Sequence, residues 1–260
     1  VVAVVGVELF LPGTLQAIVD ADGGPQNPTA LMSLLLSFIG VLLGLWIVKV
    51  ATLSDWKPIM WAKAGRVTRG ILAFGGLYAV VVGVLDLISI LYGSLLPNIP
   101  FSTWILWMPL VVVLVFIQVS AEELLFRGYI QRVLFDWSSS RLIWMVLPSV
   151  AFGALHYQPA IMGPNAWLLV VATTVFGLLA AELTYLTRSI GPAIGIHLVN
   201  NLNAFLIIQL DSGIGGFALF KTPFTPEDVE TLRVSLLQGI GLYAIILVGL
   251  LIFGRRIFRR

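Results

Sequence analysis

Long apolar runs recur along the whole sequence, and they constrain the fold of this chain more than any other feature. Hydrophobic residues make up 59% of the 260 residues and charged residues only 11%, whereas roughly 25% of an ordinary soluble domain is charged. A helix of about 20 apolar residues crosses the hydrocarbon of a bilayer. The recurrence of such runs predicts an integral membrane protein. It excludes a soluble domain with one anchor and the alternating strands of an outer-membrane barrel.

The predicted fold is an all-α polytopic membrane bundle of about eight transmembrane helices. We expect residues 1–260 to form a single integral membrane domain, because the longest polar stretches, Leu53–Arg69 and Asp211–Arg233, have the length of loops. Since the sequence begins at Val1 without a methionine, we expect a trimmed start or offset numbering. The expected spans are Val1–Val19, Ala30–Val50, Ile71–Tyr92, Leu110–Phe135, Leu142–His156, Ala166–Thr187, Ile190–Leu210 and Leu236–Phe253.

Most basic residues lie in alternate loops of this bundle. They follow the second, fourth and sixth spans and end the chain, whereas the intervening loops carry mainly acids or no charge. Lys and Arg in short loops mark the cytoplasmic side of a membrane protein. We therefore expect both termini to lie in the cytoplasm. The basic residues on this side are Lys49, Lys57, Lys63, Arg66, Arg69, Arg132, Arg141, Arg188, Arg255, Arg256, Arg259 and Arg260.

Two adjacent acids, Glu122 and Glu123, lie with Arg127 inside the apolar segment Val111–Gln131. Placing a carboxylate in a membrane span costs at least a few kcal/mol, so charge at that depth indicates a functional site. Glu123 and Arg127 are four residues apart in the favourable order for an ion pair on a helix. Glu122 is rotated by about 100° from Glu123. We expect Glu122 to face another helix, where it would be available as a general base.

The only two histidines, His156 and His197, both lie in apolar spans. Asn201 follows His197 by four residues and shares its helix face, and Asn200 is nearly as well placed. Any one of these groups alone would be explained by a hydrogen bond between helices. Together with the acids they exceed what packing requires and predict a functional site. Glu182, near the end of a span, is expected to play an interfacial, snorkelling role instead.

The polar residues fall into three short motifs on successive apolar segments, and their order resembles that of the CPBP intramembrane protease family. This family includes the CAAX prenyl endopeptidases related to the Ras-converting enzyme, and the Abi proteins linked to bacteriocin processing and self-immunity. The motif-bearing region covers about residues 111–210. The matching residues are Glu122-Glu123-x-x-x-Arg127 with Gly128, Phe152-x-x-x-His156, the stretch Ser189–Ile194, and His197-x-x-x-Asn201.

The resemblance implies an intramembrane endopeptidase with a catalytic cavity inside the helix bundle. It implies peptide-bond hydrolysis without a covalent acyl-enzyme, in which Glu122 and His156 activate a water molecule. His197 and Asn201 would then stabilise the tetrahedral oxyanion. The residue chemistry agrees, because a buried Glu is a plausible general base and two directed donors suit a developing negative charge.

The same resemblance implies a supporting role for Glu123 and Arg127, which would orient the site. The expected partners are the lipid bilayer and a peptide or lipidated-peptide substrate, of the CAAX type or the leader-peptide type, and no nucleic acid. The expected location is a bacterial or archaeal-type cell membrane. We expect no cofactor and no metal-binding residues.

A zinc-dependent membrane protease using the same residues is the alternative within catalysis. Two histidines and a carboxylate are an adequate ligand set for catalytic zinc. The sequence has no His-Glu-x-x-His motif and no cysteine, and the amide of Asn201 suits an oxyanion better than a metal. Zinc is therefore the minority prediction.

A protein without catalytic activity is the second alternative. A membrane scaffold or immunity protein would retain the polar cluster for structure, and a proton-coupled transporter would also use buried acids and histidines. Against a transporter, the sequence shows no inverted repeat and no paired broken helices. The change Glu122→Gln separates the scaffold from the protease, because only the protease needs the carboxylate.

Overall fold

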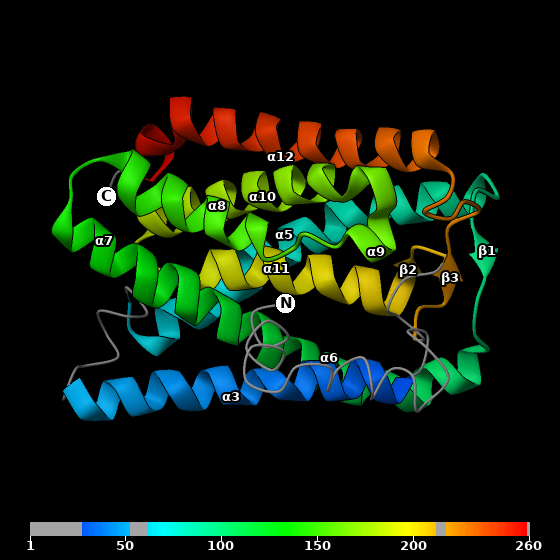
Figure 1. The fold of residues 1–260 in the computed structure, drawn as a ribbon, viewed down its shortest axis with the longest axis horizontal. Helices are drawn as coiled ribbons and strands as arrows, with labels where there is room; N and C mark the ends of the chain where they lie inside the picture. Colours follow the sequence, from blue (N-terminus) through cyan, green and yellow to red (C-terminus); the bar gives the residue numbers. More distant parts are fainter. Residues whose placement is uncertain (1–27, 53–61, 212–216, 259–260) are drawn as a thin grey trace.

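A computed structural model describes residues 28–52, 62–211 and 217–258, and almost all of the regular structure in them is helical (Figure 1). The predicted all-α membrane class is confirmed. The α-helices are α3 (Pro28–Thr52), α5 (Ala64–Leu91), α6 (Phe101–Glu123), α7 (Gln131–Trp137), α8 (Leu147–Ala154), α9 (Pro159–Met162), α10 (Ala166–Thr187), α11 (Gly191–Leu202) and α12 (Val229–Ile257). Three π-helical segments, η1 (Leu124–Ile130), η2 (Leu142–Val146) and η4 (Asn203–Ile207), and one 3₁₀ turn, η3 (Gly163–Asn165), continue or precede them.

Within the described residues, four stretches of helix are long and apolar enough to cross a membrane, so the chain is an integral membrane protein. They are Ala64–Leu91, Phe101–Trp137, Pro159–Thr187 and Val229–Ile257, and the shorter apolar helices are Leu35–Ala51 and Leu142–Ala154. The predicted span Val1–Val19 lies outside the described residues. The predicted count of about eight spans is therefore not established by the structure.

The predicted boundaries are accurate for the sixth span, whereas three other predicted spans are too short. The helix α10 has the predicted bounds, whereas α5, α6 and α12 begin at Ala64, Phe101 and Val229, several residues before the predicted starts. The prediction for α6 began just after Pro109, yet this proline lies inside the helix. Membrane helices tolerate an internal proline because neighbouring groups satisfy the backbone group that it frees.

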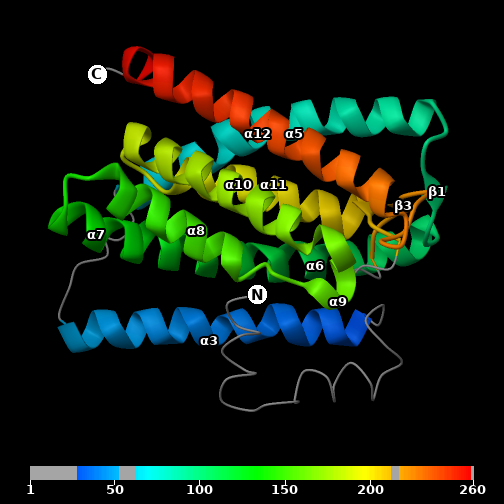
Figure 2. The ribbon, with the colours of Figure 1, turned by 45° about the horizontal axis from the view of Figure 1, so that its top comes forward.

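The helix α11 lies at the centre of the bundle. It packs against α5, α6 and α10, while α3 covers α6 and α12 covers α10 (Figures 1 and 2). The backbones of α11 and α5 approach so closely that a Cβ atom on Gly195 would lie 2.7 Å from the carbonyl oxygen of Ile71 and 2.8 Å from the nitrogen of Gly75. Small residues allow helix backbones in membranes to approach in this way. This contact fixes α11 two residues before His197.

Three two-residue strands join the loops at the end of the bundle seen at the right of Figure 1. The strand β3 (Phe220–Lys221) pairs antiparallel with β1 (Leu96–Pro97) and parallel with β2 (Ile208–Gln209). Beside them, the indole of Trp104 donates a hydrogen bond of 2.8 Å to the carbonyl of Leu206. These bonds tie the first turn of α6 to the end of η4. They set the position of α6 relative to the segment that follows α11.

An ion pair and a group of aromatic rings occupy the opposite end. Glu182 is 1% exposed and pairs with the partly exposed Arg141 at 3.1 Å, so Glu182 does not snorkel, while its interfacial role stays a prediction. The guanidinium of Arg188 lies 5.1 Å from the ring centre of Tyr185, and Arg255 interacts electrostatically with Glu182. Arginines from the start of η2, the end of α10 and the last turn of α12 therefore meet at one end of the bundle, as the alternation of charge in the sequence predicts.

Candidate active site

The two adjacent acids end the helix α6 and are buried within the bundle. Glu122 is 1% exposed and Glu123 is 0% exposed, and the π-helical segment η1 continues the same helix past them. Arg127 within η1 is 2% exposed. Its Nη1 donates a hydrogen bond of 2.8 Å to Oε1 of Glu123. The ion pair predicted from the four-residue spacing is confirmed, and it lies where π-helical turns are often found, beside a candidate functional site.

Arg127 is fixed from three sides by neighbouring elements. In addition to Glu123, Nη2 donates to the carbonyl oxygen of Gly177 on α10 at 3.4 Å. The guanidinium carbon lies 4.5 Å from the ring centre of Phe152 on α8. A desolvated guanidinium over an aromatic face gains a cation–π attraction of a few kcal/mol at most. Arg127 therefore connects α6 to both α8 and α10, the elements that carry the rest of the site.

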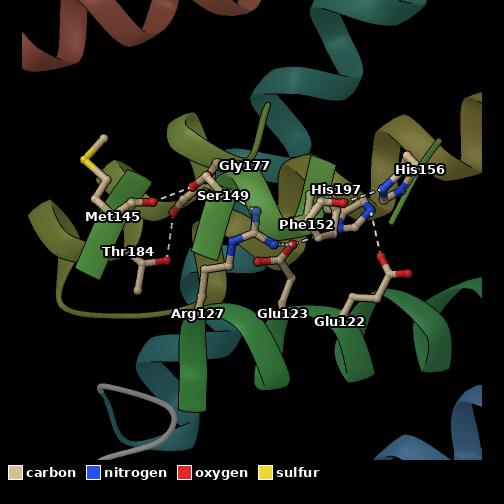
Figure 3. Close-up of polar contacts among 11 residues, drawn as sticks. Glu122, Glu123, Arg127, Met145, Ser149, Phe152, His156, Gly177, Thr184 and His197 are labelled. Carbon is tan, nitrogen blue, oxygen red and sulfur yellow. Dashed lines mark hydrogen bonds and ion pairs between the residues drawn. The ribbon is translucent and has the colours of Figure 1, made fainter. Parts of the chain in front are cut away.

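His197 lies between the two glutamates (Figure 3). Its Nδ1 is 2.8 Å from Oε1 of Glu123, and its Nε2 is 3.6 Å from Oε2 of Glu122. Sequence analysis assigned Glu123 to Arg127 alone and missed this second partner, since helical spacing says nothing about contacts between α6 and α11. A carboxylate accepts hydrogen bonds, so Nδ1 carries the proton toward Glu123. The other nitrogen, Nε2, is then the one that faces Glu122.

Aromatic rings enclose the imidazole of His197. The ring of Phe152 meets it edge-to-face at 5.9 Å between centres, and the ring of Phe176 does so at 5.1 Å. His197 itself is only 4% exposed. Edge-to-face contacts fix the plane of a ring. The imidazole therefore has one orientation, with Nδ1 toward Glu123 and Nε2 toward Glu122.

The helix α8 ends at Ala154, and His156 lies two residues beyond it. The predicted fifth span had extended to His156. Its ring is 4.7 Å from that of Phe152, and its Nδ1 is 2.8 Å from the carbonyl oxygen of Phe152. It interacts electrostatically with Glu122 and His197, and Figure 3 shows it beside His197 on the Glu122 side. A carbonyl can only accept, so Nδ1 donates. In the neutral ring Nε2 is then left as the basic nitrogen.

Asn201 and Asn200 are both partly buried, and they have different partners. Nδ2 of Asn201 donates to Oε1 of Gln118 at 3.2 Å, whereas Oδ1 of Asn200 accepts from the hydroxyl of Tyr243 at 2.7 Å. Gln118 was not among the predicted site residues. Its position could have indicated a role, because Gln118 precedes Glu122 by four residues in an apolar run and so shares its helix face. Gln118 brings Asn201 to the face of α6 that carries Glu122.

Acidic and basic side chains are in contact throughout this cluster. Glu123 lies against both Arg127 and His197, and Glu122 lies 3.6 Å from His197. Buried ions are tolerated only when they are paired and hydrogen-bonded. The arrangement brings a carboxylate and an imidazole together, the two kinds of group that most often carry out acid–base chemistry.

The geometry gives no support to a zinc site. Among the residues that the structure describes, no group of three or more His, Cys, Asp or Glu side chains is arranged to hold a metal ion. The Nδ1 atoms of His197 and His156 are engaged by Glu123 and by the Phe152 carbonyl, an arrangement that occurs both in acid–base sites and in metal sites and so does not separate the two. The absence of a cofactor stays a prediction, to be tested by chelation.

The region of the chain that holds these residues matches a known protein family. Residues 103–203 match the family described as type II CAAX prenyl endopeptidase Rce1-like. The match begins two residues after the start of α6 and ends within η4, so it includes every candidate site residue from Glu122 to Asn201. The resemblance to CPBP proteases inferred from the three motifs is confirmed.

A more distant relative covers a longer part of the chain. It is the protein of Bacillus subtilis (strain 168) named "Uncharacterized protein YyaK", which is 26% identical over 151 residues, or 58% of this chain. The aligned part is 50% of that protein, so the chain spans about half the length of the curated relative that it matches. No solved structure matches the chain.

Proposed function

We propose that this chain, whose residues 103–203 belong to the Rce1-like family of type II CAAX prenyl endopeptidases, is an intramembrane endopeptidase with a glutamate-activated water. One observation carries the proposal. The imidazole of His197 lies between two fully buried glutamates, with Nδ1 on Glu123 and Nε2 facing Glu122. A bundle held only by interhelical hydrogen bonds has no need of a second acid at this position.

In the proposed reaction, Glu122 acts as the general base. A water molecule between Glu122 and Nε2 of His156 loses a proton to the carboxylate as its oxygen attacks the scissile carbonyl. Glu122 suits this role because it is buried beside two imidazole groups, with Oε2 3.6 Å from Nε2 of His197 and with His156 in electrostatic contact. The same proton is then delivered to the leaving amine. No covalent bond to the protein forms at any step.

His197 and Asn201 supply the oxyanion donors. With Nδ1 donating to Glu123, His197 would donate to the oxyanion from Nε2 in its protonated form. Asn201 has two amide N–H groups, of which one is on Gln118, leaving the other for the oxyanion. Removing one donor of this kind from an oxyanion site typically lowers kcat by about 10² to 10³.

Glu123 and Arg127 position His197. The carboxylate holds the imidazole in one tautomer and one orientation, and the guanidinium holds the carboxylate. A carboxylate that orients a catalytic histidine contributes to the rate without touching the substrate. We therefore assign Glu123 a positioning role rather than a second base.

We infer that the substrate is a peptide or lipidated peptide that reaches the site from the bilayer. The site lies among membrane-spanning helices, and residues 103–203 match a family described as type II CAAX prenyl endopeptidase Rce1-like. The arginine-rich end of the bundle supports a cytoplasmic location for that end. The CAAX type and the leader-peptide type of substrate both fit this geometry.

A comparison of membrane protein termini tests the proposal. Membranes from cells expressing wild type or Glu122→Gln are digested and analysed for new C- and N-termini by mass spectrometry. We expect at least one pair of termini to appear only with wild type, because glutamine keeps the shape of Glu122 but takes up no proton. Both proteins are expected to accumulate to similar levels.

Glu182→Gln is the matched control for this comparison. It also replaces a fully buried glutamate by its amide, in the ion pair with Arg141, far from the proposed chemistry. Cells expressing this variant should retain the wild-type termini for the amount of protein that folds. If wild type and Glu122→Gln give identical termini under every growth condition, the protease assignment is wrong and the scaffold alternative is favoured.

Exhaustive chelation tests the proposed absence of a metal. We expect the purified protein to keep its full cleavage activity after dialysis against a strong zinc chelator, since the proposed base and donors are side chains. Loss of activity that returns on adding zinc, and not on adding magnesium, would establish the zinc alternative.

A further inference from the structure

Two tyrosines outside the family match connect to the candidate oxyanion residue through a chain of hydrogen bonds. Tyr78 lies on α5 and Tyr243 on α12, whereas residues 103–203 form the matched region. Their hydroxyl oxygens are 3.3 Å apart. The hydroxyl of Tyr243 then donates to Oδ1 of Asn200 at 2.7 Å, a short distance for a neutral hydrogen bond.

The chain continues from Asn200 to α6. Nδ2 of Asn200 donates to Oδ1 of Asn201 at 3.3 Å, and Nδ2 of Asn201 donates to Oε1 of Gln118 at 3.2 Å. Every link therefore runs in the same direction, from the hydroxyl of Tyr243 toward the face of α6 that carries Glu122. Hydrogen bonds joined in one direction polarise and orient each other.

The direction of the chain depends on the proton of Tyr243. An asparagine side chain can turn by 180° and exchange its oxygen and nitrogen. With the Tyr243 hydroxyl donating to Asn200, Oδ1 of Asn200 faces Tyr243 and Nδ2 points at Asn201. If Asn200 turned over, its oxygen would face Oδ1 of Asn201, and two acceptors repel. Asn201 would then have to turn as well, and its amide nitrogen would leave the site.

The surroundings of Tyr243 restrict its choice of partner. The two tyrosines line an apolar cavity of about 310 Å³ between α5, α10, α11 and α12. Phe176 also lines this cavity, and its ring lies 5.4 Å from that of Tyr243 and 5.1 Å from that of His197. A tyrosine hydroxyl buried among apolar groups needs a partner. Here the available partners are Tyr78 and Asn200.

We propose that Tyr243 is a positioning residue that fixes the amide orientation of Asn201 through Asn200. The inference rests on the proposed function, since it gives Asn201 the role of oxyanion donor. It assigns α12, which lies outside the matched region, a part in the reaction. Asn200 is thereby distinguished from Asn201 as the residue that transmits the orientation.

The orientation of the two amides can be observed without a substrate. The chain has six asparagines, so ¹⁵N-asparagine labelling gives a side-chain amide spectrum that single Asn→Asp variants assign. We expect Tyr243→Phe to shift or broaden the signals of both Asn200 and Asn201. The signals of Asn98 and Asn165, which bind backbone carbonyls elsewhere, should not move. Ile246→Val, which alters the same cavity wall, is the control and should leave both amides unchanged.

Cleavage kinetics on a peptide identified from the wild-type-specific termini provide the second measurement. Tyr243→Phe should lower kcat by about tenfold with little change in KM, less than the loss expected for Asn201 itself. Ile246→Val should match wild type. A rise in KM at constant kcat would contradict a positioning role and indicate a contact with substrate.

The two measurements separate failure of this inference from failure of the proposed function. If Tyr243→Phe moves only the Asn200 signals and leaves those of Asn201 at their wild-type positions, the inference is overturned whatever the protein hydrolyses. If the amide signals of both asparagines move but wild type produces no new termini, the effect of Tyr243 on the orientation of Asn201 is established and the protease function is rejected.

Discussion

The residues of the site divide into those that act and those that hold them in place. Glu122, His156, His197 and Asn201 converge from α6, the end of α8 and α11, and the proposed chemistry uses all four. Glu123 is shared between Arg127 and His197 through a single oxygen atom, at 2.8 Å to each. The two adjacent glutamates therefore differ in what they bind, although they are the same residue type in the sequence.

The variants Glu122→Gln and Glu123→Gln are predicted to differ in stability. Removing the charge of Glu123 leaves the guanidinium of Arg127 buried without its carboxylate, which costs about 3 to 5 kcal/mol. Glu122→Gln keeps the size and shape of the side chain and leaves the pair of Glu123 with Arg127 intact, so it is expected to unfold close to wild type. Thermal unfolding in detergent, followed by tryptophan fluorescence, should show a clearly lower Tm only for Glu123→Gln.

Glu123→Gln is also predicted to lower the cleavage rate by at least about tenfold in the fraction that stays folded, because the imidazole of His197 loses its fixed tautomer. Equal Tm values for the two variants would contradict the ion-pair account. Equal activity of Glu123→Gln and wild type would contradict the positioning role.

At the residue scale, sequence patterns predict contacts within a helix and not contacts between helices. The spacing of Glu123 and Arg127 gave their ion pair directly, since residues four apart share a helix face. The bonds from His197 to Glu123 and from Asn201 to Gln118 join α11 to α6. Their existence depends on how the two helices are rotated and placed, which no local spacing encodes.

Among the elements, α11 determines the site because its close packing leaves it little freedom. Gly195 of α11 lies against Gly75 of α5 in backbone contact, and the segment from Gly191 to His197 is buried. The stretch Ser189–Ile194 was noted in the sequence only as part of a motif. The structure gives it a physical purpose, since its small residues let α5 approach the turn that precedes His197.

Gly195→Ala is predicted to destabilise the protein by about 1 to 3 kcal/mol, because the added methyl would overlap the backbone of α5. Gly76→Ala is the matched control, since a Cβ there meets nothing within 4 Å, and alanine favours a helix over glycine. Unfolding in detergent should show a lower Tm for Gly195→Ala and an unchanged or slightly higher Tm for Gly76→Ala. The reverse order would contradict the packing described here.

The π-helical segments are the elements that sequence analysis did not predict. They adjoin the motifs, with η1 carrying Arg127, η2 leading into α8 and η4 following Asn201. Hydropathy registers only the length of an apolar run, and a π-helical turn has the same composition as an α-helical one. By contrast, each of the four long apolar helices among the described residues overlaps a predicted span, because crossing a bilayer requires a long apolar run that hydropathy detects.

For the whole molecule, the proposed membrane orientation rests on the collection of arginines at one end of the bundle. Because the chain has no cysteine, single cysteines can report on each end without background labelling. Ser94, next to β1, and Ser139, in the loop between Arg132 and Arg141, are both exposed. On intact cells a membrane-impermeant maleimide should label Ser94→Cys and label Ser139→Cys only after permeabilisation. The opposite pattern would reverse the proposed orientation.

Purified protein in lipid vesicles provides the most direct test of the central claim, that Glu122 activates water for peptide hydrolysis. The substrate is a synthetic peptide spanning a cleavage position found only with wild type, and the comparison is between wild type and Glu122→Gln of equal Tm. We predict that Glu122→Gln lowers the cleavage rate by at least about 10², in the range expected for a general base, while the peptide still binds. Cleavage by Glu122→Gln at the wild-type rate would contradict the account.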